Sequence, residues 1–228
     1  MPRCPTALAV FVAAVALLVA VPASAQNATR RDLKEGVNEN TPALELFLRA
    51  YEVFSHPRCA NCHPRDERPR WGERSERIHG MNVQRGVEQP PGDEKRPEGG
   101  YGRPGMTCPT CHQQTNGALP GSPPGAEHWR LAPLRMGWVG LTAVELCQQF
   151  SEVIRRDGSG DIDAVIHHIV EPDNKKKWVK EGKEWKTDPL VAWAWAPGPG
   201  RERAPGEFKQ FLEILRWWKK AGGRCPTK

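Results

Sequence analysis

The sequence predicts a mainly α-helical, loop-rich fold, and three observations lead to this class. Apolar residues recur at helical spacing in residues 41–55, from residue 142 onward, and in residues 207–220. No segment alternates polar and apolar residues over the length of a strand. The 228 residues include 22 glycines and 22 prolines, and charged residues make up 26%. Because such a composition leaves little apolar surface for a core, we expect something besides side-chain packing to stabilise the chain.

The first 25 residues predict a secretory signal peptide. Arg3 precedes the apolar run "ALAVFVAAVALLVAV", and Ala23-Ser24-Ala25 has the pattern of a cleavage site, so we expect cleavage after Ala25. A membrane anchor is the alternative, but the run is shorter than the ~20 residues that a span needs. The expected location is the periplasm. Cysteines there must be explained as disulfides, metal ligands or covalent attachment points.

The first predicted helix covers residues 41–55. Thr41 can cap it, and Pro42 suits its first position. One face of this helix is predicted to carry its apolar side chains, namely Leu44, Phe47, Leu48 and Tyr51. The helix leads directly into the first cysteine motif.

Three further helices are predicted after residue 140. The first begins with a capping box of Thr142 and Glu145 and carries an apolar stripe. Residues 161–170 predict a short helix, and residues 207–220 predict the last one, which ends at Gly222-Gly223. Cys147 lies in the apolar stripe predicted for the helix that begins at 142. Cys147 and Cys225 both need a structural role. These two cysteines are predicted to form a disulfide, with two free buried thiols as the alternative.

A Cys-x-x-Cys-His motif occurs twice in the chain. The first motif is Cys59, Cys62 and His63, and 49 residues later the second is Cys108, Cys111 and His112. This motif is typical of covalent c-type haem attachment: the thiols form thioethers with the vinyl groups, and the histidine supplies an axial ligand to the iron. The sequence therefore predicts two haem c groups.

Three other interpretations of the cysteine pairs are weaker. In a zinc ribbon the two pairs are usually ~15–20 residues apart, but 45 residues separate them here. A zinc site would also leave both adjacent histidines unused. A disulfide across a two-residue gap is strained and easily reduced, and a thioredoxin-like motif needs a βαβ context that the sequence lacks.

Two stretches of the sequence resemble a known family. They are "HPRCANCHP…HGMNVQRG…GMTCPTCHQ" and "DPLVAWAWAPGPGR" at 188–201. They resemble the periplasmic diheme c-type cytochromes and, more weakly, the cytochrome subunits associated with molybdenum-hydroxylase-type oxidoreductases such as those acting on isoquinoline. The resemblance implies a cytochrome c-type chain wrapped around two haems. We expect a diheme-binding region at 26–140, with haem 1 at about 42–82 and haem 2 at about 106–140, and a C-terminal helical region at 141–228 that packs on it.

The sixth ligand of each iron is predicted from the same repeat. A histidine follows each motif histidine by 16 residues, which favours His79 for haem 1 and His128 for haem 2. His168, His167 and Met136 are the rivals for haem 2. The remaining candidates are His56, which lies too close to its motif to reach the far side of a ring, Met81 and Met106.

The predicted function is the carriage of single electrons between a dehydrogenase and a respiratory acceptor, without an enzymatic reaction of its own. Two alternatives remain: a diheme peroxidase-like enzyme, and a cytochrome subunit of a larger oxidoreductase complex. Residues 174–187, rich in lysine and tryptophan, either form a docking patch for an acidic redox partner or a solvated helix. The net charge of +6 comes from basic residues scattered among acidic ones, so nucleic acid is not expected as a partner. The mature chain is expected to have no membrane span.

Overall fold

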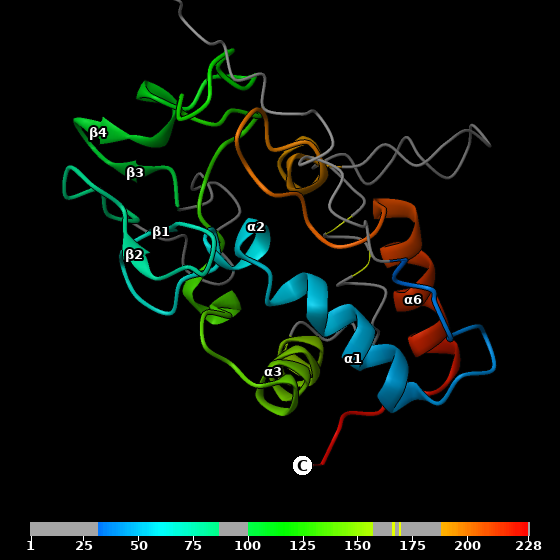
Figure 1. Cartoon of the computed structure of the whole chain (residues 1–228). Coiled ribbons are helices and arrows are strands. Elements are labelled where there is room, and N and C mark those ends of the chain that lie inside the picture. The colour runs from blue at the N-terminus through cyan, green and yellow to red at the C-terminus, as the bar shows by residue number, and fades with distance from the viewer. Residues whose placement is uncertain (1–31, 87–99, 157–165, 167–168, 170–187, 228) are drawn as a thin grey trace, which may run out of the picture. The chain divides into compact units, whose positions relative to one another are not determined.

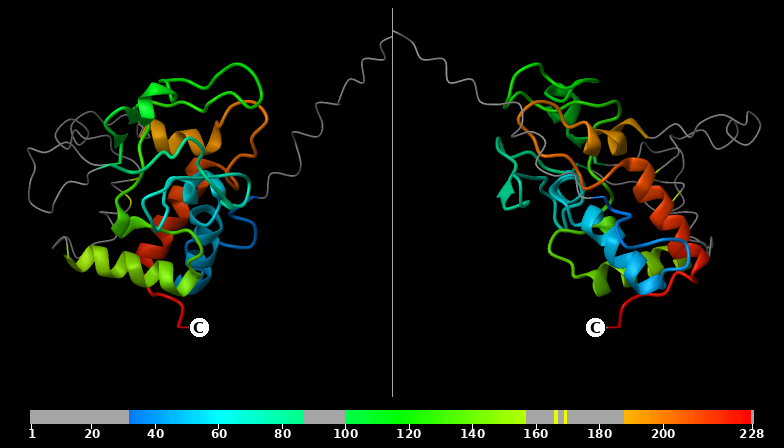
Figure 2. Two further views of the ribbon diagram at one scale, coloured as in Figure 1. Left: turned by 90° about the vertical axis from the view of Figure 1, so that its left-hand side faces the viewer. Right: turned by 45° about the vertical axis from the view of Figure 1, so that its right-hand side comes forward.

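Three helices form the main core of the protein. A computed structural model describes residues 32–86, 100–156, 166, 169 and 188–227, which belong to a compact unit of residues 31–228. The core helices are α1 (Ala43–Phe54), α3 (Ala143–Arg156) and α6 (Phe208–Lys220). Figures 1 and 2 show α1 lying beside α6, and α1 also contacts α3. The predicted signal peptide, the segment at 174–187 and most of the helix predicted at 161–170 lie outside the described residues.

The remaining regular structure in the described residues is short. It includes two helices of four residues, α2 (Pro57–Ala60) and α5 (Pro189–Ala192). It also includes the 3-10 turns η2 (Cys108–Thr110), η3 (Leu134–Met136) and η4 (Trp193–Trp195). Strands β1 (Arg70–Trp71) and β2 (Arg77–Ile78) form one antiparallel pair, and β3 (Gly102–Arg103) and β4 (Met106–Thr107) form another. The described residues are thus helical and loop-rich with little strand, as the sequence predicts for the coarse class. No described helix is long and apolar enough to cross a membrane.

Helix α1 buries only part of the predicted face. Phe47 is buried as predicted, whereas Leu44 and Leu48 are 46% and 43% exposed. The buried residues are Ala43, Leu46, Phe47, Ala50, Val53 and Phe54. Apolar spacing could not show which apolar residues of α1 would be buried, because this depends on where α3 and α6 pack against the helix. Thr41 does not cap α1 either: its hydroxyl accepts a bond from the Asn38 amide at 2.9 Å.

The starts of α3 and α6 follow local sequence signals. The Thr142 hydroxyl accepts a bond from the Glu145 amide at 3.3 Å, and the Glu145 carboxylate accepts one from the Thr142 amide at 2.8 Å, so the predicted capping box is confirmed. Glu207 and Gln210 form a second capping box at α6. Helix α6 ends before Gly222, which has a φ of 94° that suits only glycine.

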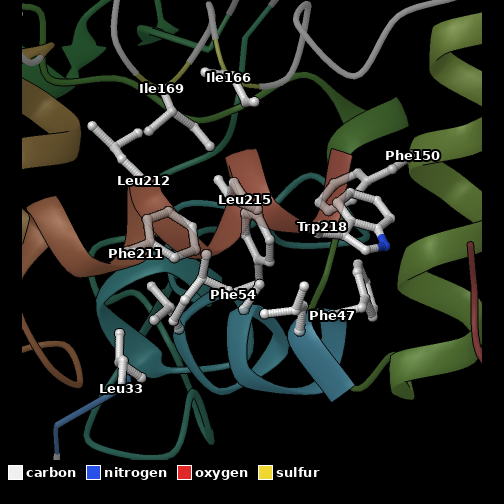
Figure 3. Close-up of a cluster of buried hydrophobic side chains, with 14 of the residues drawn as sticks. Leu33, Phe47, Phe54, Phe150, Ile166, Ile169, Phe211, Leu212, Leu215 and Trp218 are labelled. Atoms are coloured by element: carbon white, nitrogen blue, oxygen red, sulfur yellow. The ribbon is translucent and has the colours of Figure 1, made fainter. Parts of the chain in front are cut away.

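Aromatic rings fill the space between the three core helices (Figure 3). The Phe54 ring of α1 lies 4.9 Å from Phe150 of α3 and 5.1 Å from Phe211 of α6. It also lies 5.1 Å from Trp138, which belongs to the loop between the second motif and α3. The core is therefore continuous with the surroundings of the cysteine motifs.

The predicted disulfide between Cys147 and Cys225 is confirmed. It joins α3 to the C-terminal segment across 78 residues. Replacing both cysteines by alanine is expected to lower the free energy of unfolding by about 2–4 kcal/mol, because the unfolded chain gains conformational freedom. Thermal unfolding of the double variant and of the reduced wild-type chain should give similarly lowered midpoints. Equal midpoints for the oxidised wild type and the variant would contradict the expectation.

Candidate functional site

The first motif lies on a helical turn at the end of α1. His56 begins α2, and its ring nitrogen Nδ1 accepts a bond from the Arg58 amide at 3.3 Å. The turn continues past α2, because the amide of Cys62 donates to the Cys59 carbonyl at 3.1 Å. Residues three apart on such a turn share one face, so both thiols are on the same side. His63 follows immediately, and its amide donates to the Ala60 carbonyl at 2.9 Å.

The second motif repeats this turn in a different setting. It follows the β3–β4 pair, and its first three residues form η2. The amides of Cys111 and His112 both donate to the Cys108 carbonyl, at 3.2 and 2.9 Å. The two motifs therefore share a local fold although the elements before them differ.

The four motif cysteines are free thiols in the structure. Burial raises the pKa of Cys59 and of Cys62 to about 12, and it also raises the pKa of Cys108. The Cys108 thiol adds to the shift of the Cys62 pKa. The loop at Leu131 and Ala132 contacts both motifs, because the Ala132 amide donates to the Cys62 carbonyl and the Leu131 amide donates to the Gly100 carbonyl, which also accepts the Cys108 thiol. These three thiols, in residues that are each half-buried, are therefore protonated at neutral pH. Within the described ranges, no three His, Cys, Asp or Glu side chains gather closely enough to hold a metal ion by themselves.

Both motif histidines have the same immediate surroundings. The Nδ1 of His63 lies 2.7 Å from the Met136 carbonyl oxygen, and the Nδ1 of His112 lies 2.7 Å from the Pro124 carbonyl oxygen. Each ring also stacks on a tryptophan: His63 on Trp138 at 3.4 Å and 9°, and His112 on Trp129 at 4.5 Å and 4° between centroids and planes. Because a carbonyl can only accept, Nδ1 carries the proton, and Nε2 is the nitrogen whose lone pair can bind a metal.

A glycine follows each of the two carbonyl acceptors. A Cβ on Gly125 would lie 2.1 Å from the Thr115 carbonyl oxygen, and one on Gly137 would lie 2.8 Å from the Pro64 carbonyl oxygen. Each glycine thus allows its loop to approach the segment that follows a motif histidine. This repeated Xaa-Gly feature was missed in the sequence, where it is hidden among 22 glycines.

His56 has the opposite hydrogen-bond pattern. Because its Nδ1 accepts a backbone amide, the neutral ring carries its proton on Nε2 and offers no metal ligand in this state. Burial lowers the pKa of His56 to about 4, and the nearby Arg58 contributes to the shift. The folded chain therefore keeps His56 uncharged at neutral pH.

The stability contributed by His56 is expected to depend on pH. Its folded pKa lies below the usual 6.5, so the unfolded chain binds the proton more readily. This contribution is present above pH 6.5 and is lost as the pH falls towards 4. Asparagine is a good N-cap that does not titrate, so His56→Asn should flatten the fall of the unfolding midpoint between pH 6.5 and 4. Parallel curves for the variant and the wild type would contradict the assignment.

The other predicted ligands are placed as follows. The ring of His79 lies 6.1 Å from that of His112, the histidine of the second motif, although the repeat pairs it with His63. Burial lowers the pKa of His112, and the nearby His79 contributes in the same direction.

His128 is exposed and has a φ of 58°. The Met136 side chain belongs to the main core. Two other candidates are exposed, Met81 and Met106, and two lie outside the described residues, His167 and His168.

Two buried arginines near the motifs were missed in the sequence. The Arg85 side chain is fully buried, and its guanidinium donates to three backbone carbonyls, those of Pro64, Asp66 and Ala132. No local pattern marks Arg85, because it lies in a polar loop and its carbonyl partners are distant in sequence.

The second buried arginine directly precedes the first motif. Arg58 is 6% exposed, donates to the Glu202 carbonyl at 2.5 Å and pairs with the Glu73 carboxylate. Its guanidinium also lies 5.9 Å from the centroid of the Trp193 ring. Arg58 thus connects the first motif to the segment at 188–201 that carries part of the family resemblance.

The segment at 188–201 also contacts residues that neighbour the second motif. The Trp193 ring lies 4.9 Å from Trp129 at 85°, and its Nε1 donates to the Asn116 side-chain oxygen at 2.8 Å. Trp129 in turn stacks on His112.

Comparisons with protein-family models, with curated proteins and with solved structures each found no match.

Proposed function

We propose that this chain is an exported diheme c-type cytochrome that carries single electrons between a dehydrogenase and a respiratory acceptor. One observation carries the proposal. Two Cys-x-x-Cys turns, each with both thiols on one side, are each followed by a histidine whose Nδ1 is held by a carbonyl and whose ring stacks on a tryptophan. This donor set fits a covalently attached haem, because both thiols and the unprotonated Nε2 belong to one turn.

The residues of the chain have distinct roles in this proposal. Cys59 and Cys62 would attach one haem and His63 would bind its iron. Cys108, Cys111 and His112 would do the same for the other haem. When bound, the haems supply one-electron oxidation and reduction. The carbonyls of Met136 and Pro124 fix the tautomers, and the stacked tryptophans fix the ring orientations and exclude water.

The proximity of the two motifs supports an electron carrier with two neighbouring haems. The Cys108 thiol contributes to the raised pKa of Cys62, and it donates to the Gly100 carbonyl at 3.6 Å. The amide of Ala132 also donates to the Cys62 carbonyl at 2.9 Å, and that of Leu131 donates to the Gly100 carbonyl at 2.9 Å, so one loop contacts the surroundings of both motifs. Redox groups held this close within one chain can exchange electrons.

Removing one pair of thiols tests the proposal. We expect export with a haem-attachment system to give two haems per chain for the wild type and one for Cys59→Ala/Cys62→Ala or Cys108→Ala/Cys111→Ala, counted by a pyridine haemochrome assay. The matched control Cys147→Ala/Cys225→Ala should keep both haems, because these cysteines form the disulfide. Unchanged haem content in the motif variants would refute the proposal. Peroxide turnover by the two-haem chain alone would favour the peroxidase-like alternative.

A further inference from the structure

The distance between the His79 and His112 rings fits two ligands of one metal ion. Their centroids are 6.1 Å apart. A metal binds an imidazole nitrogen at about 2.0–2.1 Å, and the ring centroid lies ~1.1 Å behind that nitrogen, so two rings on opposite sides of one ion have centroids about 6 Å apart. The planes of the two rings differ by 61°. Rings that share one axis can be rotated about it, so this angle is compatible with shared ligation.

Both rings also present the nitrogen that a metal needs. The Nδ1 of His79 lies 3.0 Å from the Gly80 carbonyl oxygen, as the Nδ1 of His112 lies 2.7 Å from that of Pro124. Each Nδ1 is therefore a donor, and each Nε2 is the free lone-pair nitrogen. His79 thus shares the hydrogen-bond pattern of the two motif histidines, whereas His56 has the reverse pattern.

The β1–β2 pair fixes the position of His79. Arg70 pairs with Ile78 in this ladder, and the His79 amide donates to the Pro69 carbonyl at 2.9 Å. The Trp71 indole nitrogen donates to the Ile78 carbonyl at 3.1 Å. These bonds hold the peptide group between Ile78 and His79, so the His79 backbone is positioned by a short ladder that belongs to the segment after the first motif.

We infer that His79 and His112 are the two axial ligands of one haem, the haem attached at Cys108 and Cys111. This inference rests on the proposed function. It replaces the pairing of His79 with His63, and it removes His128 from the role that the repeat predicts for it. The segment of the first motif then supplies a ligand to the second haem, so the two haem sites are tied together and neither folds alone around its own motif.

The test uses the complete two-haem chain and its spectra. We expect His79→Ala to keep both haems covalently attached while one of the two becomes high-spin in the ferric visible and EPR spectra. The affected haem is identified by the indole NMR signals of Trp129, which stacks on His112, and of Trp138, which stacks on His63. The Trp129 signal should shift and the Trp138 signal should stay.

Three outcomes would overturn the pairing: two low-spin haems in His79→Ala, a shift of the Trp138 signal in place of the Trp129 signal, or conversion of the Cys108-attached haem to high-spin by His128→Ala.

If His79→Ala does not fold, His79→Met provides the same test. A methionine ligand keeps the iron low-spin but raises its potential, so one of two reduction potentials should rise and the Trp129 signal should shift. A chain without haem would refute the proposed function instead, so the two failures are distinguishable.

Discussion

Replacing Arg85 by methionine is expected to lower the free energy of unfolding by on the order of 4 kcal/mol. The buried guanidinium donates to three backbone carbonyls, and methionine fills a similar volume without any donor. Each carbonyl left without a partner in a buried region costs about 1–3 kcal/mol. Chemical denaturation of the variant and the wild type, both with their haems, measures the difference.

The Arg85 variant should also affect the first motif. In the wild type, Arg85 donates to the carbonyl of Pro64, which follows His63. It also donates to the carbonyl of Ala132, whose amide donates to the Cys62 carbonyl. We expect a lower yield of chains with both haems attached. Arg103→Met is the matched control, because Arg103 is exposed on β3 and should change the stability by less than about 0.5 kcal/mol. Equal losses in the two variants would contradict this role of Arg85.

Replacing Phe54 by alanine is expected to cost about 3–5 kcal/mol, as for other fully buried phenylalanines. Phe54 is 2% exposed and contacts rings of α3, α6 and the Trp138 loop. Because Trp138 stacks on His63, the cavity should also loosen the first motif histidine. Leu44→Ala on the same helix is the control, since Leu44 is 46% exposed. Thermal unfolding that is equally lowered by both substitutions would contradict the observed orientation of α1.

Local signals in the sequence predicted part of the fold. The capping box of Thr142 and Glu145, the glycines after α6 and the pairing of Cys147 with Cys225 depend on neighbouring residues or on the compartment, and the structure confirms them. The buried face of α1 depends on which helix packs against it. Apolar spacing alone could not distinguish the exposed Leu44 from the buried Leu46.

The sequence also predicted part of the candidate site. The three residues of each motif are close together in sequence, so each group was visible at once. The position of His79 next to His112 could not be predicted, because the repeat implies that each motif keeps its own histidine, whereas the β1–β2 ladder directs His79 to the second motif. The carbonyls of Met136 and Pro124 left no signal either, since any residue supplies a backbone carbonyl.

The mass and visible spectrum of the exported, purified chain test the central claim most directly. The account predicts a coloured protein that begins at Gln26, with the mass of the polypeptide plus two haems that survive denaturation. Its reduced spectrum should show the sharp bands of low-spin c-type haem. A colourless protein whose mass equals that of the polypeptide alone, despite export in a cell that attaches haem to other proteins, would contradict it.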